Sequence, residues 1–403
     1  MAPQFAARHH EADRVGLRDR QSAMHTVPAR VLQMAFGRVL PMPIHKLHIA
    51  GYRSIRDLRL SLGRVNVVTG PNGVGKSNLY RAIHLMAKAA RGQLAESIAL
   101  EGGMPSVLCA LPRRDRKPVR MRMGIELDEF SYELACGLPI PGATMFFLDP
   151  AVKEEFVWLG SQRKPTTTLL SRKNTMVTVR DCEGRSVEYP MELEHNESVL
   201  SQVKEPHRYP ELSVLREEIL GWRFYHQFRT DPESPMRVPR IGVRTPVLSN
   251  DGSDLVAALQ TILEIGRGDR LADAVDHAFP GAELEIDCDT GRNTSRLILQ
   301  LRIPGVPRPM EEHELSDGTL RYLCLVAALL SPRPPSFLAL NEPEASLHPD
   351  LIEPLARLIA DAAADSQLWV TTHSTRLAEY ITEFSGESAR QLKMVDGETL
   401  VVE

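Results

Sequence analysis

The sequence predicts an α/β fold that combines a buried parallel sheet with an antiparallel, β-rich region, and three observations support this prediction. Residues 64–70 form a β-branched run that passes through a glycine-rich loop into an amphipathic helix. From 315 to 372, helix and strand patterns alternate, which is typical of a parallel sheet covered on both faces. Between 121 and 189, short segments of alternating apolar and polar residues are separated by turn residues, as in an antiparallel sheet.

The elements can be placed in chain order from the same patterns. Residues 46–63 alternate as a half-buried hairpin does, and Leu79, Ile83 and Met86 share one stripe of the helix after the glycine-rich loop. The stretch 207–246 is rich in proline and arginine, and we expect it to return from the β-rich region to the core as loop and short helix. The other predicted elements are helices at 253–266, 315–330 and 349–364 and strands at 296–303, 336–341 and 368–372.

The composition is that of an ordinary globular protein. The chain has 403 residues, of which 43% are hydrophobic and 25% charged, and its formal net charge is −4. This charge gives no overall attraction to nucleic acid or to an anionic membrane, so such a contact would need a local patch. The longest apolar run, Leu323–Leu330, is far shorter than the roughly 20 residues that a membrane-spanning helix needs. We therefore expect no association with a membrane.

The cysteines and the first residues indicate the compartment. The 5 cysteines are far apart and include no CxxC pair, which argues against a disulfide framework and against a zinc site. Residues 1–42 lack the apolar core of a secretory signal and are expected to form a poorly ordered tail. A cytoplasmic location is therefore expected.

The strongest chemical signal is the sequence GPNGVGKSN at 70–78, which fits the pattern GxxxxGK[ST] between a strand and a helix. Glycines let the backbone wrap closely around phosphate groups, and the helix directs its partly positive N-terminus at the same anion. Lys76 would neutralise phosphate charge, and the Ser77 hydroxyl would contact Mg²⁺. The pattern predicts a nucleotide site, with these candidate contacts: Gly70, Asn72, Gly73, Gly75, Lys76, Ser77 and Asn78.

A second signal is the apolar strand FLALN, which leads into Glu342. A carboxylate at the end of a buried strand is costly unless it acts there, so Glu342 is the candidate for activating water. The alternative is a glutamate that merely begins a loop.

Two further motifs lie near predicted strand or helix ends. Ser316 in LSDGT stands at the N-cap of a largely apolar helix, where its hydroxyl and the backbone N–H groups could bind an anion. The alternative is an ordinary cap on a buried helix. His373 ends a strand parallel to FLALN, at the sheet edge where ligands of α/β proteins bind. The alternative here is a structural histidine.

Taken together, GPNGVGKSN, ELSDGT, FLALNEPEASLHP and TTHS resemble the ABC-type ATPase heads of the SMC, RecF and OLD-like group. Within that group they look most like the stand-alone RecF-like ATPases that carry ELSDGT and LNEPE. The likeness covers 44–100 and 311–380, and the middle matches only loosely. It implies a P-loop ATPase head, with these segments: a tail at 1–42, the N-terminal part of the head with Walker A at 43–120, an accessory β-rich lobe with the Q-loop region at 121–246, and the C-terminal part of the head at 247–403.

The resemblance implies a composite site in which two copies dimerise around ATP and Mg²⁺. The Walker A loop of one copy would bind ATP, and Ser316 and Gly318 in the signature motif of the other would close over it. Glu342 would activate water, Lys76 would hold phosphate, and His373 would sense the γ-phosphate. Gln227 is the candidate Q-loop residue. The resemblance thus implies three side chains that face Mg²⁺: Ser77, Gln227 and Asn341.

Two positions depart from the pattern of this group. Asn341 stands where most relatives have the Walker B aspartate, so the metal would meet a neutral amide, and we expect weaker Mg²⁺ binding and slow ATP hydrolysis. Asp317 replaces the more usual glycine of the signature and places a negative charge near a helix start.

The remaining features bear on what the ATPase drives. No sustained heptads occur between Lys76 and Leu315, which excludes a long coiled-coil arm. Only about 30 residues follow His373, so no fused nuclease is expected. Basic clusters at 113–122 and 223–244 favour contact with DNA, the second with aromatic residues for stacking: Trp222, Phe224, Tyr225 and Phe228. The alternative for both clusters is solvated loops or walls of the nucleotide site.

We expect an ATPase that homodimerises in ATP and acts in DNA repair or in defence against foreign DNA, with DNA and a separately encoded effector protein as candidate partners. The alternative is a scaffold that binds ATP, recruits a partner protein and does not hydrolyse ATP. The ATPase subunit of a transporter is disfavoured, because the accessory lobe is long and no membrane-docking surface is evident.

Overall fold

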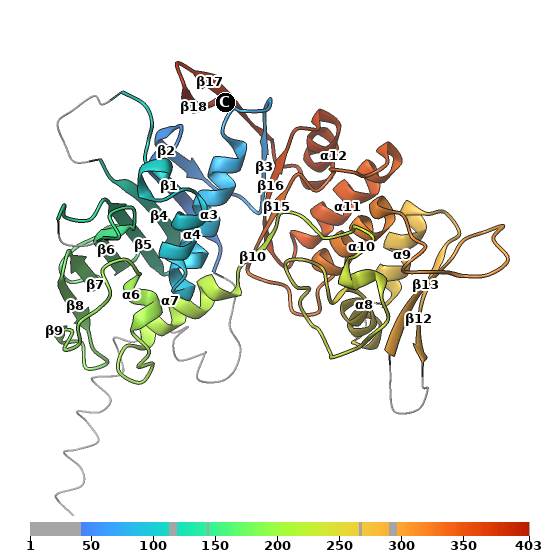
Figure 1. Ribbon diagram of the computed structural model, residues 1–403, viewed down its shortest axis with the longest axis horizontal. Helices are drawn as coiled ribbons and strands as arrows, with labels where there is room; N and C mark the ends of the chain where they lie inside the picture. Colours follow the sequence, from blue (N-terminus) through green and yellow to red (C-terminus); the bar gives the residue numbers. More distant parts are fainter. Residues whose placement is uncertain (1–41, 113–118, 143–144, 266–267, 290–295, 403) are drawn as a thin grey trace, which may run out of the picture.

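The computed structural model describes residues 42–112, 119–142, 145–265, 268–289 and 296–402. The predicted tail therefore lies outside the described residues, apart from Met42. Within the described ranges the strands form three sheets, and the first and second of these enclose one helix between them (Figure 1). In the same ranges, every helix is too short or too polar to span a membrane.

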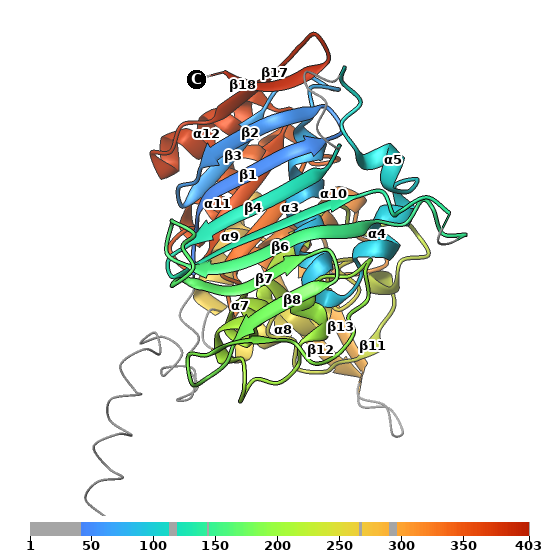
Figure 2. The ribbon, with the colours of Figure 1, turned by 90° about the vertical axis from the view of Figure 1, so that its left-hand side faces the viewer.

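The first sheet is antiparallel and has eight strands in the order β2-β1-β4-β5-β6-β7-β8-β9. Figure 2 looks onto the broad face of this sheet, with the helices behind it. In the middle of β1, Leu47 and Ile49 are buried and His48 between them is half-buried, as expected for a sheet with one wet face. The strands are β1 (Ile44–Tyr52), β2 (Ile55–Ser61), β4 (Met121–Leu127), β5 (Phe130–Gly137), β6 (Ala151–Leu159), β7 (Thr168–Lys173), β8 (Met176–Arg180) and β9 (Ser186–Glu188).

The second sheet is the predicted buried parallel sheet, with the strand order β10-β15-β16-β3-β17-β18. Its pairings are parallel except for that of β17 with β18. The strands are β3 (Val65–Thr69), β10 (Arg223–Tyr225), β15 (Phe337–Asn341), β16 (Gln367–Thr372), β17 (Arg390–Val395) and β18 (Glu398–Val402). The predicted α/β fold class, a buried parallel sheet together with an antiparallel sheet, is confirmed.

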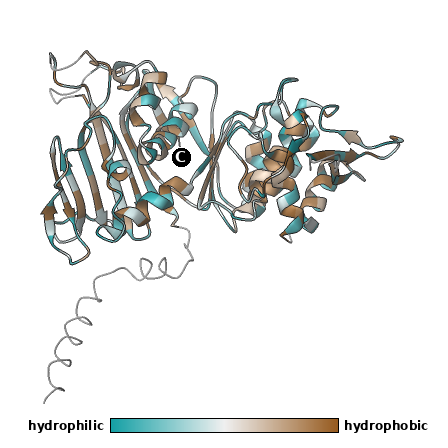
Figure 3. Ribbon diagram, turned by 60° about the horizontal axis from the view of Figure 1, so that its bottom comes forward, coloured by the Kyte–Doolittle hydropathy of each residue, from teal (hydrophilic) through white to brown (hydrophobic). Residues whose placement is uncertain are grey.

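The parallel sheet separates two apolar cores. Phe337 of β15 and Trp369 of β16 belong to the core shared with the antiparallel sheet, whereas their neighbours Leu338 and Val370 belong to the other core. This alternation is the period of two that a strand buried on both faces requires. Figure 3 shows apolar residues both along the strands of the antiparallel sheet and within the helices on the opposite side of the parallel sheet.

Helices fill both cores. Helix α3 (Lys76–Arg91) contacts β1 and β4 of one sheet and β15 and β16 of the other, so it lies between the two sheets. On the same side are α4 (Leu94–Leu100), α5 (Met104–Val107), α6 (Val199–Gln202) and α7 (Pro210–Gly221). The second core contains α8 (Leu255–Glu264), α9 (Gly268–Ala278), α10 (Asp317–Leu329), α11 (Ile352–Ala362) and α12 (Thr375–Ser385). Two short 3₁₀ turns are Pro235–Arg237 and Pro349–Leu351.

A third, small antiparallel sheet lies beside α8 and α9. Its strand β13 (Arg296–Arg302) pairs with β12 (Glu283–Asp289) on one side and with β11 (Arg240–Ile241) and β14 (Met310–Glu311) on the other. This sheet completes the half of the molecule that holds α10.

Two arrangements are not evident from the sequence. The hairpin β1–β2 pairs with β4, so one continuous sheet contains strands from both sides of the predicted boundary at 120; the division into segments stays a prediction. In the stretch 207–246, expected as loop and short helix, residues 223–225 join the parallel sheet as the edge strand β10. A three-residue strand gives too short a pattern to separate from a loop.

Candidate functional site

The strands β3, β15 and β16 end level with one another, and candidate residues follow each of them. Thr69 pairs with Thr372, and Thr371 pairs with Asn341. Because the strands are parallel, their carboxyl ends meet at one sheet edge. The residues directly beyond these ends are Gly70, His373 and Glu342. Segments far apart in the sequence are therefore brought to one place.

The P-loop, residues 70–77, connects β3 to α3. Its three glycines, Gly70, Gly73 and Gly75, have positive φ angles of 149°, 83° and 102°. The Lys76 ammonium lies inside the loop, where Nζ donates hydrogen bonds to the carbonyl oxygens of Gly70 (2.6 Å) and Pro71 (3.0 Å). The loop thus has the backbone and the buried cation that a phosphate site needs.

The environment of Lys76 combines burial with nearby acid groups. The residue is 4% exposed. Burial lowers the pKa of Lys76, and the neighbouring carboxylates of Glu342 and Glu344 act in the opposite direction. The structure therefore places Lys76 and Glu342 at the same site, although 266 positions separate them in the sequence.

The polar residues of the loop differ in what they contact. Ser77 in the first turn of α3 and Asn72 in the loop are exposed. Asn78 is half-buried, and its Nδ2 donates to Ser54 Oγ (2.8 Å) in the turn between β1 and β2. Ser77 is therefore accessible to a ligand, whereas Asn78 anchors the loop to the antiparallel sheet.

Glu342 follows β15 with a strained backbone. Its φ angle is 47°, which is uncommon for a residue other than glycine. Two contacts hold this conformation: its N–H donates to the Thr371 carbonyl (2.8 Å), and its carbonyl accepts from Arg321 Nη2 (3.0 Å). Such strain is common where a side chain must take a defined position in a site. The half-buried Glu342 side chain meets that description.

Asn341 is buried, and both ends of its amide are engaged within the protein. Its Oδ1 accepts from Thr371 Oγ1 (2.6 Å), and its Nδ2 lies 2.7 Å from His226 Nδ1. Burial lowers the pKa of His226, which favours the neutral ring that can accept this hydrogen bond. In this arrangement the amide is occupied by protein partners.

Glu344 is a site residue to which the sequence analysis assigned no role. It is buried, and its Oε1 accepts hydrogen bonds from the Thr372 hydroxyl, from His373 N (3.1 Å) and from Ser374 N (3.3 Å). His373 Nδ1 also lies 3.3 Å from Oε1, while the buried Oε2 has no hydrogen-bond partner among the described residues. Glu344 thus fixes the loop that carries His373. The second acid of LNEPE was the signal that could have identified it.

The signature loop lies at the start of α10. Ser316 is exposed, and its Oγ accepts from Thr319 N (3.1 Å), which confirms the predicted N-cap. Gly318 packs against a neighbouring loop, because a Cβ there would lie 2.9 Å from the Ser346 carbonyl oxygen. The cap leaves Ser316 accessible at the surface.

The negative charge of Asp317 is balanced by Arg237, which the sequence analysis did not assign to the site. Arg237 Nη2 lies 2.5 Å from Asp317 Oδ1, and its Nη1 donates to the Leu315 carbonyl (2.7 Å). The Arg237 side chain is 10% exposed, whereas that of Asp317 is 58% exposed. Arg237 therefore holds the signature loop and offsets the acid at the helix start.

Arg321 connects the signature helix to Glu342 within one copy of the chain. It is buried in α10, and Nη2 bonds the Glu342 carbonyl as described above. Burial lowers the pKa of Arg321, and the carboxylates of Glu344 and Glu342 act in the opposite direction. A shift of α10 would therefore move Arg321 and change its hydrogen bond to the Glu342 carbonyl.

Gln227 is exposed just beyond β10. Tyr225 pairs with Leu340, so two residues further along each strand Gln227 is level with Glu342. The register therefore places Gln227 at the same sheet edge as the other candidates.

The donor set fits a magnesium nucleotide better than a metal alone. The edge offers the P-loop backbone, the Ser77 hydroxyl, the Glu342 carboxylate and the unpaired Glu344 Oε2. In the described part of the chain, no group of three or more His, Cys, Asp and Glu side chains could hold a metal ion. Mg²⁺ commonly binds through few protein groups together with phosphate oxygens, so this set suits Mg²⁺ only in the presence of a triphosphate.

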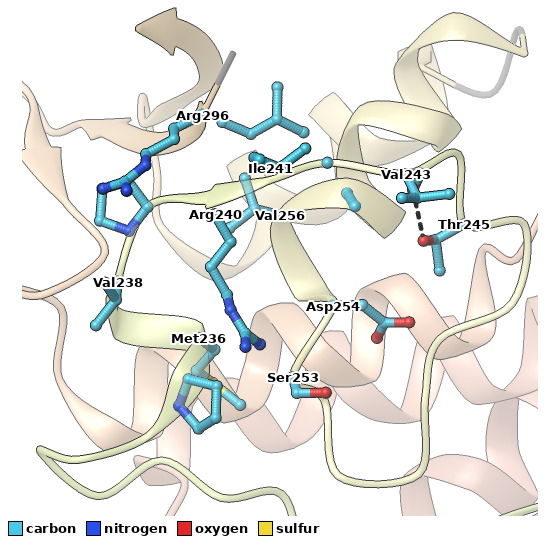
Figure 4. A pocket seen from close by; sticks show the side chains of 15 residues that line it. Met236, Val238, Arg240, Ile241, Val243, Thr245, Ser253, Asp254, Val256 and Arg296 are labelled. Atoms are coloured by element: carbon cyan, nitrogen blue, oxygen red, sulfur yellow. Dashed lines mark hydrogen bonds between the residues drawn. The ribbon is translucent and has the colours of Figure 1, made fainter. Parts of the chain in front are cut away.

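A cavity of about 670 Å³ lies elsewhere, between α8 and the segment that precedes it. Figure 4 shows Arg240, Ile241 and Val243 along that segment, opposite Ser253 and Asp254 at the start of α8. The lining residues come from 235–257 and from 296–297. This cavity neighbours Arg237 but is separate from the sheet edge that holds the P-loop.

Most of the aromatic residues and arginines expected to contact DNA in the stretch 222–244 instead contact other parts of the protein. The expectation that aromatic residues stack on bases is wrong, because all four are buried in the two cores: Trp222, Phe224, Tyr225 and Phe228. In the same stretch Arg229 pairs with Asp231 and Arg244 with Glu264. The strand that ends at Tyr225 explains the error, since its apolar side chains pack inward.

The first basic cluster is partly described. Residues 113–118 lie outside the described ranges. The remaining arginines are ion-paired on the antiparallel sheet: Arg120 with Glu154, and Arg122 with both Glu133 and Glu154. These arginines form ion pairs with acids on neighbouring strands of the antiparallel sheet.

Comparison with known proteins places the chain in a family. A family model described as "AAA domain, putative AbiEii toxin, Type IV TA system" matches residues 65–129 and 186–379, which is more than half of the chain. The matched ranges contain the P-loop, Gln227, the signature, Glu342 and His373. No curated protein matches the chain.

Solved structures similar to the chain include three heads of SMC proteins. An SmcHead bound to the C-winged helix domain of ScpA has 14% identity and a TM-score of 0.49, with 89% of this chain and 97% of that chain covered. An SMC head domain from Thermotoga maritima has 16% identity and a TM-score of 0.41, with coverage of 90% and 98%. An Smc head with an extended coiled coil, bound to the C-terminal domain of ScpA derived from Pyrococcus furiosus, has 14% identity and a TM-score of 0.47, with coverage of 90% and 96%.

Proposed function

We propose that this chain, which belongs to the family described as an AAA domain, is an SMC- and RecF-like ATPase of the ABC type, and that two copies of it bind ATP and Mg²⁺ between them and hydrolyse ATP. The observation that carries the proposal is the convergence at one sheet edge of Lys76, Glu342 and His373, with an exposed Ser316 in the same chain. A P-loop ATPase needs a cation on the phosphates and an acid near the attacking water, and both are present.

We propose the following roles within one copy. The P-loop backbone and Lys76 bind the phosphates, Glu342 orients and polarises the attacking water, and His373 contacts the terminal phosphate. Glu344 holds the loop of His373 through three hydrogen bonds. Bound Mg²⁺ would offset phosphate charge, and the residues proposed to face it are Ser77, Gln227 and Asn341.

We propose that Ser316 and Gly318 act on the nucleotide of the second copy. The helix start at Ser316 is exposed, and its backbone N–H groups suit an anion. Among the described residues, the Ser316 hydroxyl bonds only to Thr319, within its own turn. The signature loop is therefore free to meet a ligand that another molecule carries.

The biological setting is proposed more broadly. The family description names a toxin of a toxin–antitoxin system, which has two components and supports a separately encoded partner protein. We propose that the ATPase acts in DNA repair or in defence against foreign DNA, in the cytoplasm. The 5 cysteines, all free, fit that compartment. Contact with DNA remains part of the proposal, without the aromatic stacking that the structure excludes.

A second candidate is a scaffold that binds ATP and dimerises without hydrolysis. The observation that favours it is Asn341, whose amide carries no charge and is engaged by Thr371 and His226. A neutral amide that is already hydrogen-bonded within the protein binds Mg²⁺ more weakly than a carboxylate would.

The substitution Glu342→Gln separates the two candidates. For an ATPase, wild-type protein should release phosphate in Mg²⁺ and ATP, and the variant should lose this by at least about a hundredfold while dimers accumulate in ATP. Phosphate release and molecular size should be measured side by side, with Glu353→Gln on the exposed face of α11 as the matched control.

Absence of turnover in wild-type protein, with dimers that form in ATP and do not change on Glu342→Gln, would establish the scaffold instead. Absence of both turnover and ATP-dependent dimers would refute the proposal of a composite site.

A further inference from the structure

The end of the chain contacts the nucleotide site, and we propose that Thr399 is a positioning residue that holds the P-loop in its phosphate-binding conformation. The inference rests on ATP binding at the P-loop and adds to it a residue more than 300 positions away in the sequence. Thr399 lies in β18, the last strand described, and the residue is 2% exposed.

The hairpin β17–β18 continues the sheet that carries the P-loop. Strand β17 pairs in parallel with β3 through Arg390 with Val68 and Gln391 with Thr69, and Thr69 directly precedes the loop. Figure 1 shows the hairpin beside the ends of β3 and α3, close to the C-terminus of the chain. The hairpin is therefore built into the wall behind the P-loop.

A chain of hydrogen bonds joins the hairpin to the loop. Thr399 Oγ1 donates to the Val74 carbonyl (2.9 Å) and lies 2.7 Å from Ser54 Oγ. Since the Thr399 proton is used on Val74, the Ser54 hydroxyl must donate in the second contact. Ser54 in turn accepts from Asn78 Nδ2 (2.8 Å). The chain runs from Asn78 through Ser54 and Thr399 to Val74, so it begins and ends in the P-loop region.

The packing around these bonds is tight. A Cβ at Gly75 would lie 2.2 Å from Thr399 Oγ1 and 3.1 Å from Ser54 Oγ. A Cβ at Gly70 would lie 2.8 Å from the carbonyl oxygen of Leu392 in β17. Both glycines also have positive φ angles. Gly75 is thus required for its backbone conformation and for the close approach of the Thr399 hydroxyl.

The bond to Val74 fixes the orientation of one peptide plane. In a trans peptide the C=O and the following N–H point in opposite directions. With the Val74 carbonyl held against Thr399, the Gly75 N–H must point away from the hairpin. That N–H is one of the loop donors expected to bind phosphate. Loss of the Thr399 hydroxyl would free this plane to rotate and would leave a buried carbonyl without its partner.

The test compares ATP binding in Thr399→Val, which removes the hydroxyl and keeps the shape, with Thr399→Ser, which keeps the hydroxyl. We expect Thr399→Val to weaken binding of Mg²⁺-ATP to the full chain by about tenfold, and Thr399→Ser to restore it to within about twofold of wild type. The readout is the dissociation constant from titration calorimetry, measured well below the melting temperature of each variant.

Thr261→Val in α8 is the matched control. Thr261 is equally buried, and its Oγ1 donates to the Ala257 carbonyl (2.6 Å) in the other core. We expect it to lower the melting temperature without changing ATP affinity, which separates general stability from positioning. If Thr399→Val fails to fold, Thr399→Ala removes the same hydroxyl and should also weaken ATP binding.

Unchanged ATP affinity in Thr399→Val, or in Thr399→Ala where the first does not fold, would overturn the inference, while ATP binding by the wild type would still support the proposed function. Equal weakening by Thr399→Ser and Thr399→Val would also overturn it, because the hydroxyl would then not be the cause. Wild-type protein that binds no ATP would refute the proposed function and this inference together.

Discussion

The P-loop and the signature loop are both helix starts proposed to contact the same triphosphate, but they are built in opposite ways. The P-loop begins α3, which has no acid in its first turn, and Lys76 and Thr399 are buried against it. The signature loop begins α10, is exposed, and carries Asp317 in its first turn. One half of the site is assembled within the chain, and the other is presented outward. This difference is what a site completed by a second copy requires.

The largest expected effect follows from removing the cation of the assembled half. Lys76→Ala should weaken ATP binding by at least about a hundredfold, because no other buried cation is proposed to neutralise the phosphates. The measurement is titration of Mg²⁺-ATP, with the exposed Lys393→Ala of β17 as the control.

The same variant should keep its stability without ATP. Burial lowers the pKa of Lys76, so the protonated side chain opposes folding of the ATP-free protein, and this opposition is greatest at pH values below the lowered pKa. The melting temperature of Lys76→Ala should therefore equal or exceed that of wild type at neutral pH. A large fall in melting temperature would show that Lys76 stabilises the loop instead.

The second prediction concerns the exposed half. Arg237→Gln leaves the charge of Asp317 without its partner at the helix start, so ATP-dependent dimerisation should weaken by about tenfold. ATP binding by the single copy should not change. Sedimentation analysis with and without ATP measures the dimer, and Arg240→Gln on the exposed neighbouring strand is the matched control.

The double variant with Asp317→Gly should recover part of the dimerisation, because the uncompensated charge is then absent. If Arg237→Gln instead reduced ATP binding by the single copy, the proposal that the P-loop binds ATP within one copy while the signature loop acts on the second copy would be wrong.

The smallest effect is expected at Asn341, the last residue of β15. Asn341→Asp keeps an acceptor for Thr371, gives up the N–H that His226 accepts and adds a charge beside Glu342, so the Mg²⁺ concentration needed for half-maximal ATP turnover should fall several-fold. Steady-state phosphate release at varied Mg²⁺ provides the measurement, with Asn250→Asp in an exposed loop as control. An unchanged Mg²⁺ requirement would mean that residue 341 does not face the metal.

The parts of the site that could be predicted from the sequence are those made of consecutive residues. The P-loop and the strand that ends at Asn341 can each be identified from about 20 consecutive residues. The structure has both of these elements where they were predicted. The N-cap at Ser316 is local for the same reason.

The supporting residues could not be predicted, because their partners are far away in the chain. Arg237 contacts Asp317 80 positions later, and Thr399 contacts Ser54 345 positions earlier. Glu344 meets His373 through a strand pairing that spacing alone does not fix. These contacts exist only after the sheets form.

The aromatic error has a related cause. In the sequence, the aromatic residues at 222–228 lie close to arginines, a pattern typical of a nucleic-acid-binding surface. In the structure, β10 joins the parallel sheet and these aromatic side chains are buried in the two cores. Likewise, more than 60 residues separate β1 from β4, with which it pairs. The extent of the antiparallel sheet could therefore not be predicted from either segment alone.

The most direct test of the central claim is complementation between two inactive variants. Lys76→Ala lacks a working P-loop, and Ser316→Glu places a negative charge where the second copy's phosphate is proposed to lie. Each variant alone should release almost no phosphate from ATP. If the loops act across a dimer, a one-to-one mixture should recover up to about a quarter of the wild-type rate, since about half of the dimers are mixed and each holds one intact site. A mixture as inactive as its components would contradict the account.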